Sequence, residues 1–271
     1  MKKIILISLL SLFTFGNEHF YLLPHDCEVG KKVAQNNNTH SHGSSEETAM
    51  YQVVGLDGSW KTTSFYLLPT LERQELKMSA NLVTLSKSTY GNYHALVVNG
   101  QKENQFFTAI TYIDNHGKPS KISPIKLTSF KKGLLEIEPN PLPREHDRYT
   151  ALKTYDFILK FQGLVLANQE IKLLIDEVEE VIARSDENGQ FSITLPNNFQ
   201  NVSDKRRENR AKNFILLSSF SKDNKEYFTS FYGEYHVNPT SYWQSIPLGF
   251  IIALLGFLVG VFIYFKMVRH V

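Results

Sequence analysis

Side chains that bind transition metals gather near the start of the chain. Four of the nine histidines and the only cysteine lie between residues 19 and 42: His19, His25, Cys27, His40 and His42. Imidazole and thiolate groups are ligands for nickel, cobalt, copper and zinc. The grouping therefore predicts a transition-metal site at this end of the chain.

A second pattern at the same place depends on where the chain is cut. If cleavage follows Gly16, the mature chain begins with Asn17, Glu18 and His19. A free amine, two backbone amides and an imidazole then lie in one plane, and tetragonal nitrogen sites of this kind favour Ni(II) or Cu(II). The alternative interpretation is structural, with these histidines as ordinary polar residues beside a strand and in a solvated loop.

The sequence carries no pattern that indicates catalysis. It has no G-x-S-x-G, no H-E-x-x-H, no P-loop and no pair of carboxylates with an identifiable acid and base, so we expect no enzyme. A basic run at residues 205–212 is mixed with acidic residues, which is typical of a solvated loop. The net charge is only +2 and its charges are scattered, so we expect no nucleic-acid partner.

The C-terminal end predicts a membrane helix. Residues 246–265 contain no charge, and a helix of that length spans roughly 30 Å, the thickness of the hydrocarbon core. Tyr242 and Trp243 precede the segment, where amphipathic rings favour the headgroup layer, while Lys266 and Arg269 follow it. We therefore expect residues 266–271 to be a short tail in the cytoplasm.

The N-terminal end predicts export. Residues 1–16 begin with two lysines, continue with an apolar run too short to span a bilayer, and end in small residues, which is typical of a cleaved signal peptide. An uncleaved anchor is the alternative, and a lipoprotein at Cys27 is disfavoured because no small residues precede it. The two ends together predict a single-pass protein of the inner membrane with its ectodomain in the periplasm.

The ectodomain is expected to be all-β, with two immunoglobulin-like β-sandwich domains in tandem. Its 13 tyrosines and 19 phenylalanines, with turn signals about every ten residues, favour strands over a helical bundle. We assign residues 17–132 to an N-terminal domain, with a mobile histidine-containing loop at 34–49, and residues 133–240 to a C-terminal domain. The single cysteine excludes an internal disulfide.

One segment gives conflicting signals. Residues 170–184 have apolar side chains at helical spacing, with glutamates and lysines that favour helix. Residues 190–195 alternate strictly between apolar and polar, and Asn188-Gly189 before them is a strong hairpin signal that requires a strand on each side. The residues alone leave helix and strand open.

Three stretches carry a resemblance to a known family. HFYLLP at 19–24, GLLEIEP at 133–139 and SDENGQF at 185–191 are similar to the start, the inter-domain strand and the second-domain hairpin of the periplasmic DUF4198 family. GLVLAN at 163–168 departs from the family's pattern. The resemblance implies immunoglobulin-like or carboxypeptidase-regulatory-like β domains. It also implies that residues 170–184 are extended, turn near 177–180, and pair with residues 190–195.

The resemblance further implies the handling of nickel or cobalt, with copper and zinc ranking after them. We expect a periplasmic accessory protein that binds the metal at its N-terminus and assists uptake by inner-membrane transporter subunits. Gly256 and Gly260 form a GxxxG pattern that favours a helix-mediated homodimer. The alternative function is a structural or adhesive surface module that contacts proteins without metal.

Overall fold

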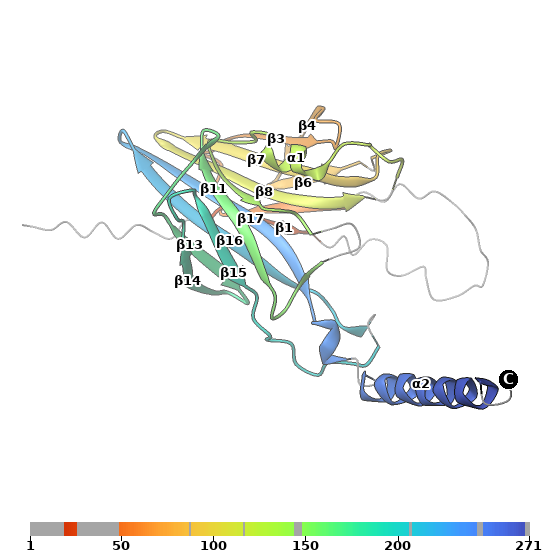
Figure 1. The fold of residues 1–271 in the computed structure, drawn as a ribbon. Coiled ribbons are helices and arrows are strands. Elements are labelled where there is room, and N and C mark those ends of the chain that lie inside the picture. The colour runs from red at the N-terminus through yellow and green to blue at the C-terminus, as the bar shows by residue number, and fades with distance from the viewer. Residues whose placement is uncertain are drawn as a thin grey trace, which may run out of the picture.

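The computed structural model describes residues 19–25, 49–86, 88–115, 117–143, 148–205, 208–242 and 246–268. A body made almost entirely of strands carries one long helix at its C-terminal end, which confirms the all-β class with a single C-terminal helix (Figure 1). The elements are β1 (Tyr21–Pro24), β2 (Ala49–Val54), β3 (Lys61–Leu67), β4 (Arg73–Leu76), β5 (Met78–Ser79), β6 (Leu82–Leu85), β7 (Asn92–Lys102), β8 (Gln105–Asn115), α1 (Pro124–Ser129), β9 (Leu135–Pro139), β10 (Tyr149–Thr150), β11 (Thr154–Phe161), β12 (Leu164–Val165), β13 (Glu170–Ile175), β14 (Val178–Arg184), β15 (Gln190–Thr194), β16 (Lys212–Lys222), β17 (Lys225–His236), the 3-10 helix η3 (Pro239–Ser241) and α2 (Ile246–Val268).

One large sheet runs through both halves of the body. Its strand order is β14-β13-β16-β17-β8-β7-β3-β4, with β10 beside β17. The two halves meet where β17 pairs with β8 in parallel, from Glu226 opposite Gln105 to Tyr232 opposite Thr111. The predicted division at residue 133 falls between α1 and β9, and the sheet crosses it without a break. The two sandwiches therefore share a layer.

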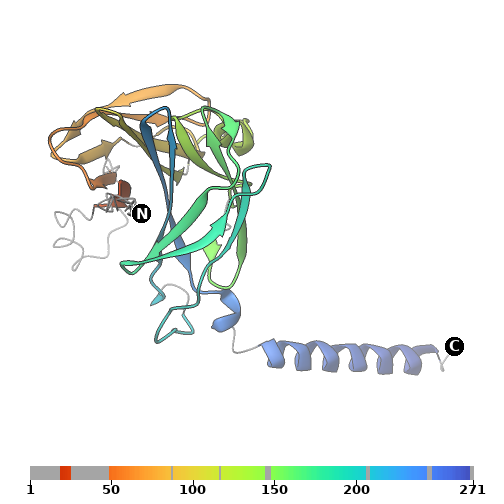
Figure 2. The ribbon, with the colours of Figure 1, turned by 90° about the vertical axis from the view of Figure 1, so that its left-hand side faces the viewer.

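A smaller sheet covers each face of this shared sheet (Figure 2). The sheet β1-β2-β6-β5 packs on one face, and β9, β11, β12 and β15 pack on the other. Side chains of β16 alternate between the two cores: Phe214 and Leu216 belong to the C-terminal core, while Ile215 and Leu217 belong to the N-terminal core. The same strand thus contributes to both halves.

The sequence explains why the central strands are covered on both sides. Residues 107–111 of β8 and 214–218 of β16 are consecutive buried residues rather than an alternation of buried and exposed ones. A strand that is buried on both faces needs such a run, whereas a strand with one wet face alternates. The two runs place β8 and β16 inside a three-layered body.

The conflict at residues 170–184 is resolved as strand. β13 and β14 form an antiparallel hairpin, and Asp176 and Glu177 turn between them with φ of 50° and 66°. The extended prediction is confirmed, but the predicted pairing with residues 190–195 is wrong. β15 pairs instead with β11 in the smaller sheet, because the turn ending in Gly189 carries the chain from one layer to the other.

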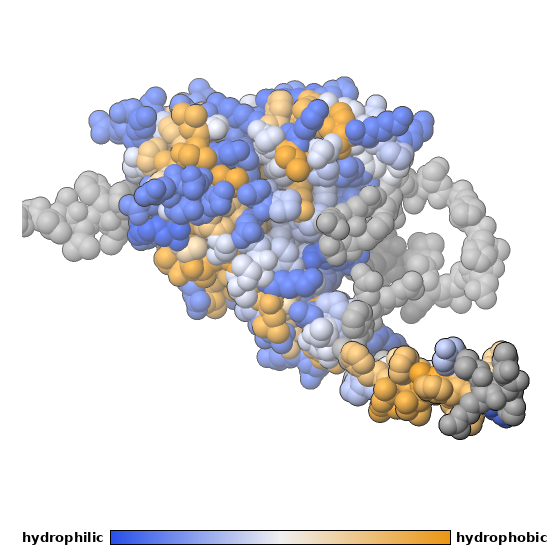
Figure 3. Space-filling model, in the orientation of Figure 1, coloured by the Kyte–Doolittle hydropathy of each residue, from blue (hydrophilic) through white to orange (hydrophobic). Residues whose placement is uncertain are grey.

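The C-terminal helix matches its prediction. α2 is long and apolar enough to cross a membrane, and none of it is buried against the body (Figure 3). The signal peptide at 1–16, nearly all of the loop at 34–49 and the last three residues lie outside the described residues. α2 is thus consistent with single-pass anchoring.

Candidate functional site

Two of the predicted metal ligands lie in the described residues. His19 precedes β1, and its Nε2 contacts Oε2 of Glu179 on β14. The other carboxylate oxygen of Glu179 lies 2.7 Å from Nζ of Lys172 on β13. His25 follows β1 with an exposed side chain, and its backbone N–H donates to the carbonyl of Met50. The two histidines therefore have different surroundings.

The other predicted ligands are Asn17, Glu18, Cys27, His40 and His42, and all five lie outside the described residues. Within the part of the chain that the structure describes, no three His, Cys, Asp or Glu side chains come together as a metal site. The metal site remains a prediction.

His94 on β7 has a structural environment. Its side chain is fully buried, with Nδ1 2.9 Å from the carbonyl oxygen of Asn92 and 3.2 Å from Nδ2 of Asn115. Its ring stacks on Tyr66 at 4.9 Å. Burial lowers the pKa of His94 below its ordinary value, so the imidazole is kept neutral inside the N-terminal core.

A cleft opens where the shared sheet splits. β8 and β17 pair as far as Thr111 and Tyr232 and then diverge, leaving a cavity of about 680 Å³ between them. Cavities of this size hold ligands or partner side chains in other proteins. The lining comprises Tyr51, Tyr93, Thr111, Tyr112, Ile113, Asp114, Leu142, Pro143, Arg148, Tyr149, Phe231, Tyr232, Gly233, Glu234 and His236. We call this cavity the tyrosine cleft.

The tyrosines of the cleft are held as neutral phenols. Burial, followed by the charge of Glu234, raises the pKa of both Tyr51 and Tyr232 above the ordinary value of 10.0. The Tyr232 hydroxyl, which has one proton to donate, lies 2.9 Å from Oδ1 of Asn213 and 3.0 Å from Oε1 of Glu234. The cleft therefore presents aromatic rings and hydroxyl groups that can form hydrogen bonds. Such groups are suited to binding a ligand or a partner.

Charged groups stand at the rim of the tyrosine cleft. Arg148 is exposed, and its Nη1 lies 3.4 Å from Nε2 of His236 at the end of β17. Asp114 and Glu234 line the same cavity and carry the opposite charge. Among the described residues, a ligand that enters the cleft meets one guanidinium and two carboxylates.

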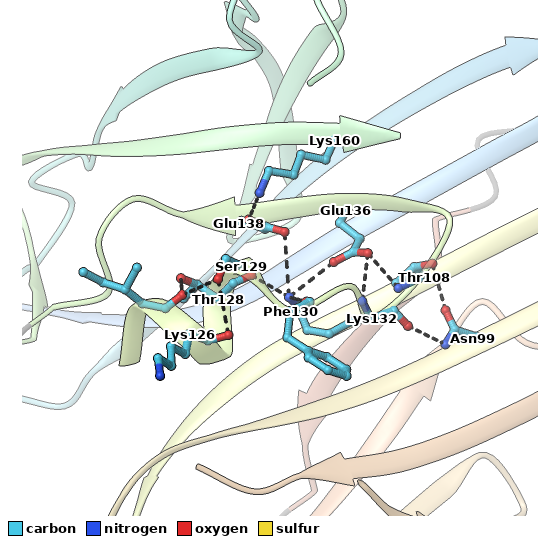
Figure 4. Close-up of polar contacts among 12 residues, drawn as sticks. Asn99, Thr108, Lys126, Thr128, Ser129, Phe130, Lys132, Glu136, Glu138 and Lys160 are labelled. Atoms are coloured by element: carbon cyan, nitrogen blue, oxygen red, sulfur yellow. Dashed lines mark hydrogen bonds and ion pairs between the residues drawn. The ribbon is translucent and has the colours of Figure 1, made fainter. Parts of the chain in front are cut away.

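A cluster of charged side chains lies largely buried at the junction of the two halves (Figure 4). Nζ of Lys132 lies 3.3 Å from Oε2 of Glu136 and 3.8 Å from Oε1 of Glu138, and Lys160 binds Glu138 at 2.6 Å. Oε1 of Glu136 accepts hydrogen bonds from the backbone N–H groups of Lys132 and Gly133 at 2.9 and 2.8 Å. Burial lowers the pKa of Lys132, while the two glutamates oppose that shift. We call these four side chains the buried ionic cluster, and its enclosure indicates a structural role.

Sequence reasoning found neither the tyrosine cleft nor the buried ionic cluster. Tyr51, Tyr93 and Tyr112 lie in β2, β7 and β8, but no local pattern in the sequence indicates that β8 lies beside β17. The burial of both strands on their two faces, which belongs to the middle of a sheet, is seen only in the structure. Lys132 follows another lysine and precedes a glycine, a pattern typical of an exposed loop.

Comparison with known proteins adds solved structures of other β proteins. No family model matches the chain, and no curated protein matches it. A two-domain fibronectin type-III segment of chicken tenascin shares 10% identity over 70% of this chain and 91% of its own, with a TM-score of 0.22. SGBP-B from the mixed-linkage glucan utilization locus of Bacteroides ovatus, solved in complex with a mixed-linkage heptasaccharide, shares 8% identity over 76% of this chain and 69% of its own, with a TM-score of 0.20. The FN1–FN3 domains of chicken CNTN1 share 7% over 70% and 61%, also at 0.20. TM-scores and identities this low carry no information about function.

Proposed function

We propose that this protein is a membrane-anchored β-sandwich module that stands outside the cytoplasm and binds a partner protein through the tyrosine cleft. The observation that carries the proposal is the opening of the shared sheet into a cavity lined by five tyrosines. Tyrosine and arginine are enriched at protein contacts, because large rings bury area while keeping a polar tip. α2 would hold the module in the bilayer.

The cleft also offers a strand edge. Tyr112 and Ile113 continue β8 beyond its last pair with β17, while the opposite edge of β8 stays paired with β7. An extended segment of a partner can form backbone hydrogen bonds along such an edge, with its side chains in the neighbouring pockets. A protein partner can pair with the strand edge of β8 and also contact the tyrosine rings. A small apolar ligand can use only the rings, so the cleft favours a polypeptide.

The first prediction concerns the rim. Arg148→Glu is expected to weaken a cleft-binding peptide at least about tenfold, because it reverses the only guanidinium among the described residues that line the cavity. Peptides selected from a displayed random library against the full chain in lipid nanodiscs would supply the probe, and fluorescence anisotropy would give the affinity. Arg184→Glu is the matched control, since Arg184 is also exposed but lies on β14. Equal losses in the two variants, or no selected peptides, would refute binding at the cleft.

A second candidate function is the capture of nickel or cobalt for a transport complex in the same membrane. The resemblance to the DUF4198 family motivates it, and the contact of His19 with Glu179 supports it. In metal-binding histidines, the N–H of the second ring nitrogen commonly donates a hydrogen bond to a carboxylate, which fixes the tautomer and the ring orientation. With Nε2 held by Glu179, the other ring nitrogen of His19 is left to complete a planar site with the mature N-terminus.

The second prediction tests this site. In a chain that begins at Asn17, His19→Ala is expected to abolish tight Ni(II) binding, and Glu179→Ala to weaken it by about 10- to 100-fold. Binding should strengthen as pH rises, because the amide protons must be displaced. Isothermal titration gives the affinity, and the visible spectrum reports square-planar nickel. His94→Ala should leave both unchanged, and tight binding that survives in His19→Ala would exclude the planar site.

A further inference from the structure

The turn of residues 151–153 carries an apolar side chain that the body does not cover. Leu152 is 58% exposed, and its φ of 63° is in the left-handed region that bulky residues avoid. The body itself holds this backbone conformation, since the N–H of Leu152 donates to the carbonyl of Leu195 at 2.8 Å. A fixed backbone thereby presents the apolar side chain of Leu152 to the outside of the body.

The turn is fastened to the segment that leads into α2. The backbone N–H of Ala151 donates to the carbonyl of His236 at 2.9 Å, and Nδ2 of Asn238 donates to the carbonyl of Ala151 at 3.1 Å. Oδ1 of Asn238 accepts from the backbone N–H of Thr240 at 3.1 Å, which caps η3. One side chain thus ties the turn to the link between the body and the helix.

These hydrogen bonds limit how far the turn can lie from the bilayer. Tyr242 closes η3 four residues after Asn238, a separation of at most about 14 Å even in a fully extended chain. A tyrosine just before a spanning helix favours the headgroup layer. Leu152 therefore lies at the membrane-facing end of the body.

Two exposed cations lie near this end. Lys153 follows Leu152 directly, and both side chains are exposed. Arg210 is also exposed and lines a cavity of about 520 Å³ together with Val237, which follows β17. Basic side chains this close to a bilayer are attracted to anionic phospholipids.

We propose that the turn of residues 151–153 is a membrane-contact site. Leu152 enters the boundary between headgroups and acyl chains of the bilayer that holds α2, and Lys153 and Arg210 contact the phosphates of anionic lipids. The contact holds the body against the membrane surface, so the body does not swing freely on the link to α2. It requires α2 to span the membrane but is independent of the tyrosine cleft and of any metal.

The test measures depth in the bilayer at two leucines of the full chain. Cys27→Ser is combined with Leu152→Cys or, as the matched control, with Leu164→Cys; Leu164 on β12 is 75% exposed and lies beyond the opposite end of β11, roughly 25 Å away. Each cysteine is labelled with a fluorophore, and the protein is reconstituted into vesicles of phosphatidylcholine and phosphatidylglycerol. A quencher on the lipid acyl chains then reports which label is in the membrane.

The label at 152 is expected to be quenched at least about threefold more than the label at 164. Lys153→Glu, or vesicles of phosphatidylcholine alone, should reduce that difference. Equal quenching at the two positions would overturn the proposal, because α2 anchors both proteins identically. An unchanged difference in Lys153→Glu and in neutral vesicles would overturn the part assigned to anionic lipids. Both leucines are exposed, so neither replacement removes a core contact.

Discussion

Glu136→Ala is expected to lower the free energy of unfolding by about 3–5 kcal/mol, because it removes the nearer of the two carboxylates that balance a buried lysine. The Lys132 side chain is fully buried and that of Glu136 is 1% exposed. The substitution also removes the acceptor of two backbone N–H groups, from Lys132 and Gly133. Urea unfolding followed by circular dichroism measures the loss.

The matched control is an ion pair of the same type at the surface. Glu170→Ala breaks the pair with Arg184, in which both side chains are 52% exposed, and should cost less than about 1 kcal/mol. The double variant Lys132→Met, Glu136→Leu should recover much of the loss, since no buried charge then remains unpaired. A Glu136→Ala protein as stable as the Glu170→Ala protein would contradict the role given to the buried ionic cluster.

Phe231→Ala is expected to destabilise both halves together by about 3–5 kcal/mol. Phe231 on β17 is 1% exposed, and its ring centroid lies 5.3 Å from that of Phe157 and 5.9 Å from that of Phe214. Because β17 also pairs with β8, loss of packing in the C-terminal core removes a neighbour from the N-terminal half.

Two probes can separate shared from independent unfolding. In a Trp243→Phe background, fluorescence of Trp60 reports the N-terminal core, and hydrogen exchange at Phe157 reports the C-terminal core. In Phe231→Ala, the unfolding transitions reported by the two probes should shift to the same lower denaturant concentration. Two separate midpoints, with Trp60 unaffected, would show that the halves unfold independently.

Local patterns in the sequence predicted the elements well. Phe191, Ile193 and Leu195 alternate with polar residues, and Gln190–Thr194 is a strand with one covered face. The uncharged run at 246–265 is the long exposed helix. These predictions succeed because a strand with one buried face, and a long helix that is apolar on all sides, can each be recognised from residues that are close together in the sequence.

The pairing of strands that are far apart in the sequence could not be predicted from these local patterns. Residues 190–195 pair with β11 and not with β14, although Asn188-Gly189 favours a hairpin, because the turn crosses between two layers. The parallel pairing of Phe107 with Phe228 joins residues 121 positions apart, and nothing near either one specifies the other. The tyrosine cleft exists only because of that pairing, so its residues could not be grouped in advance.

The sharing of β17 has a mechanical consequence. β17 is held by eleven residue pairs to β16 and seven to β8, and the chain leaves its C-terminal end toward α2. A pull on the chain at α2 would reach the body at the C-terminal end of β17 and load this strand along its length. Force in that direction shears all of these pairs at once, whereas a peeling force breaks them one by one. The strand that joins the two sandwiches is therefore also the one that would bear tension.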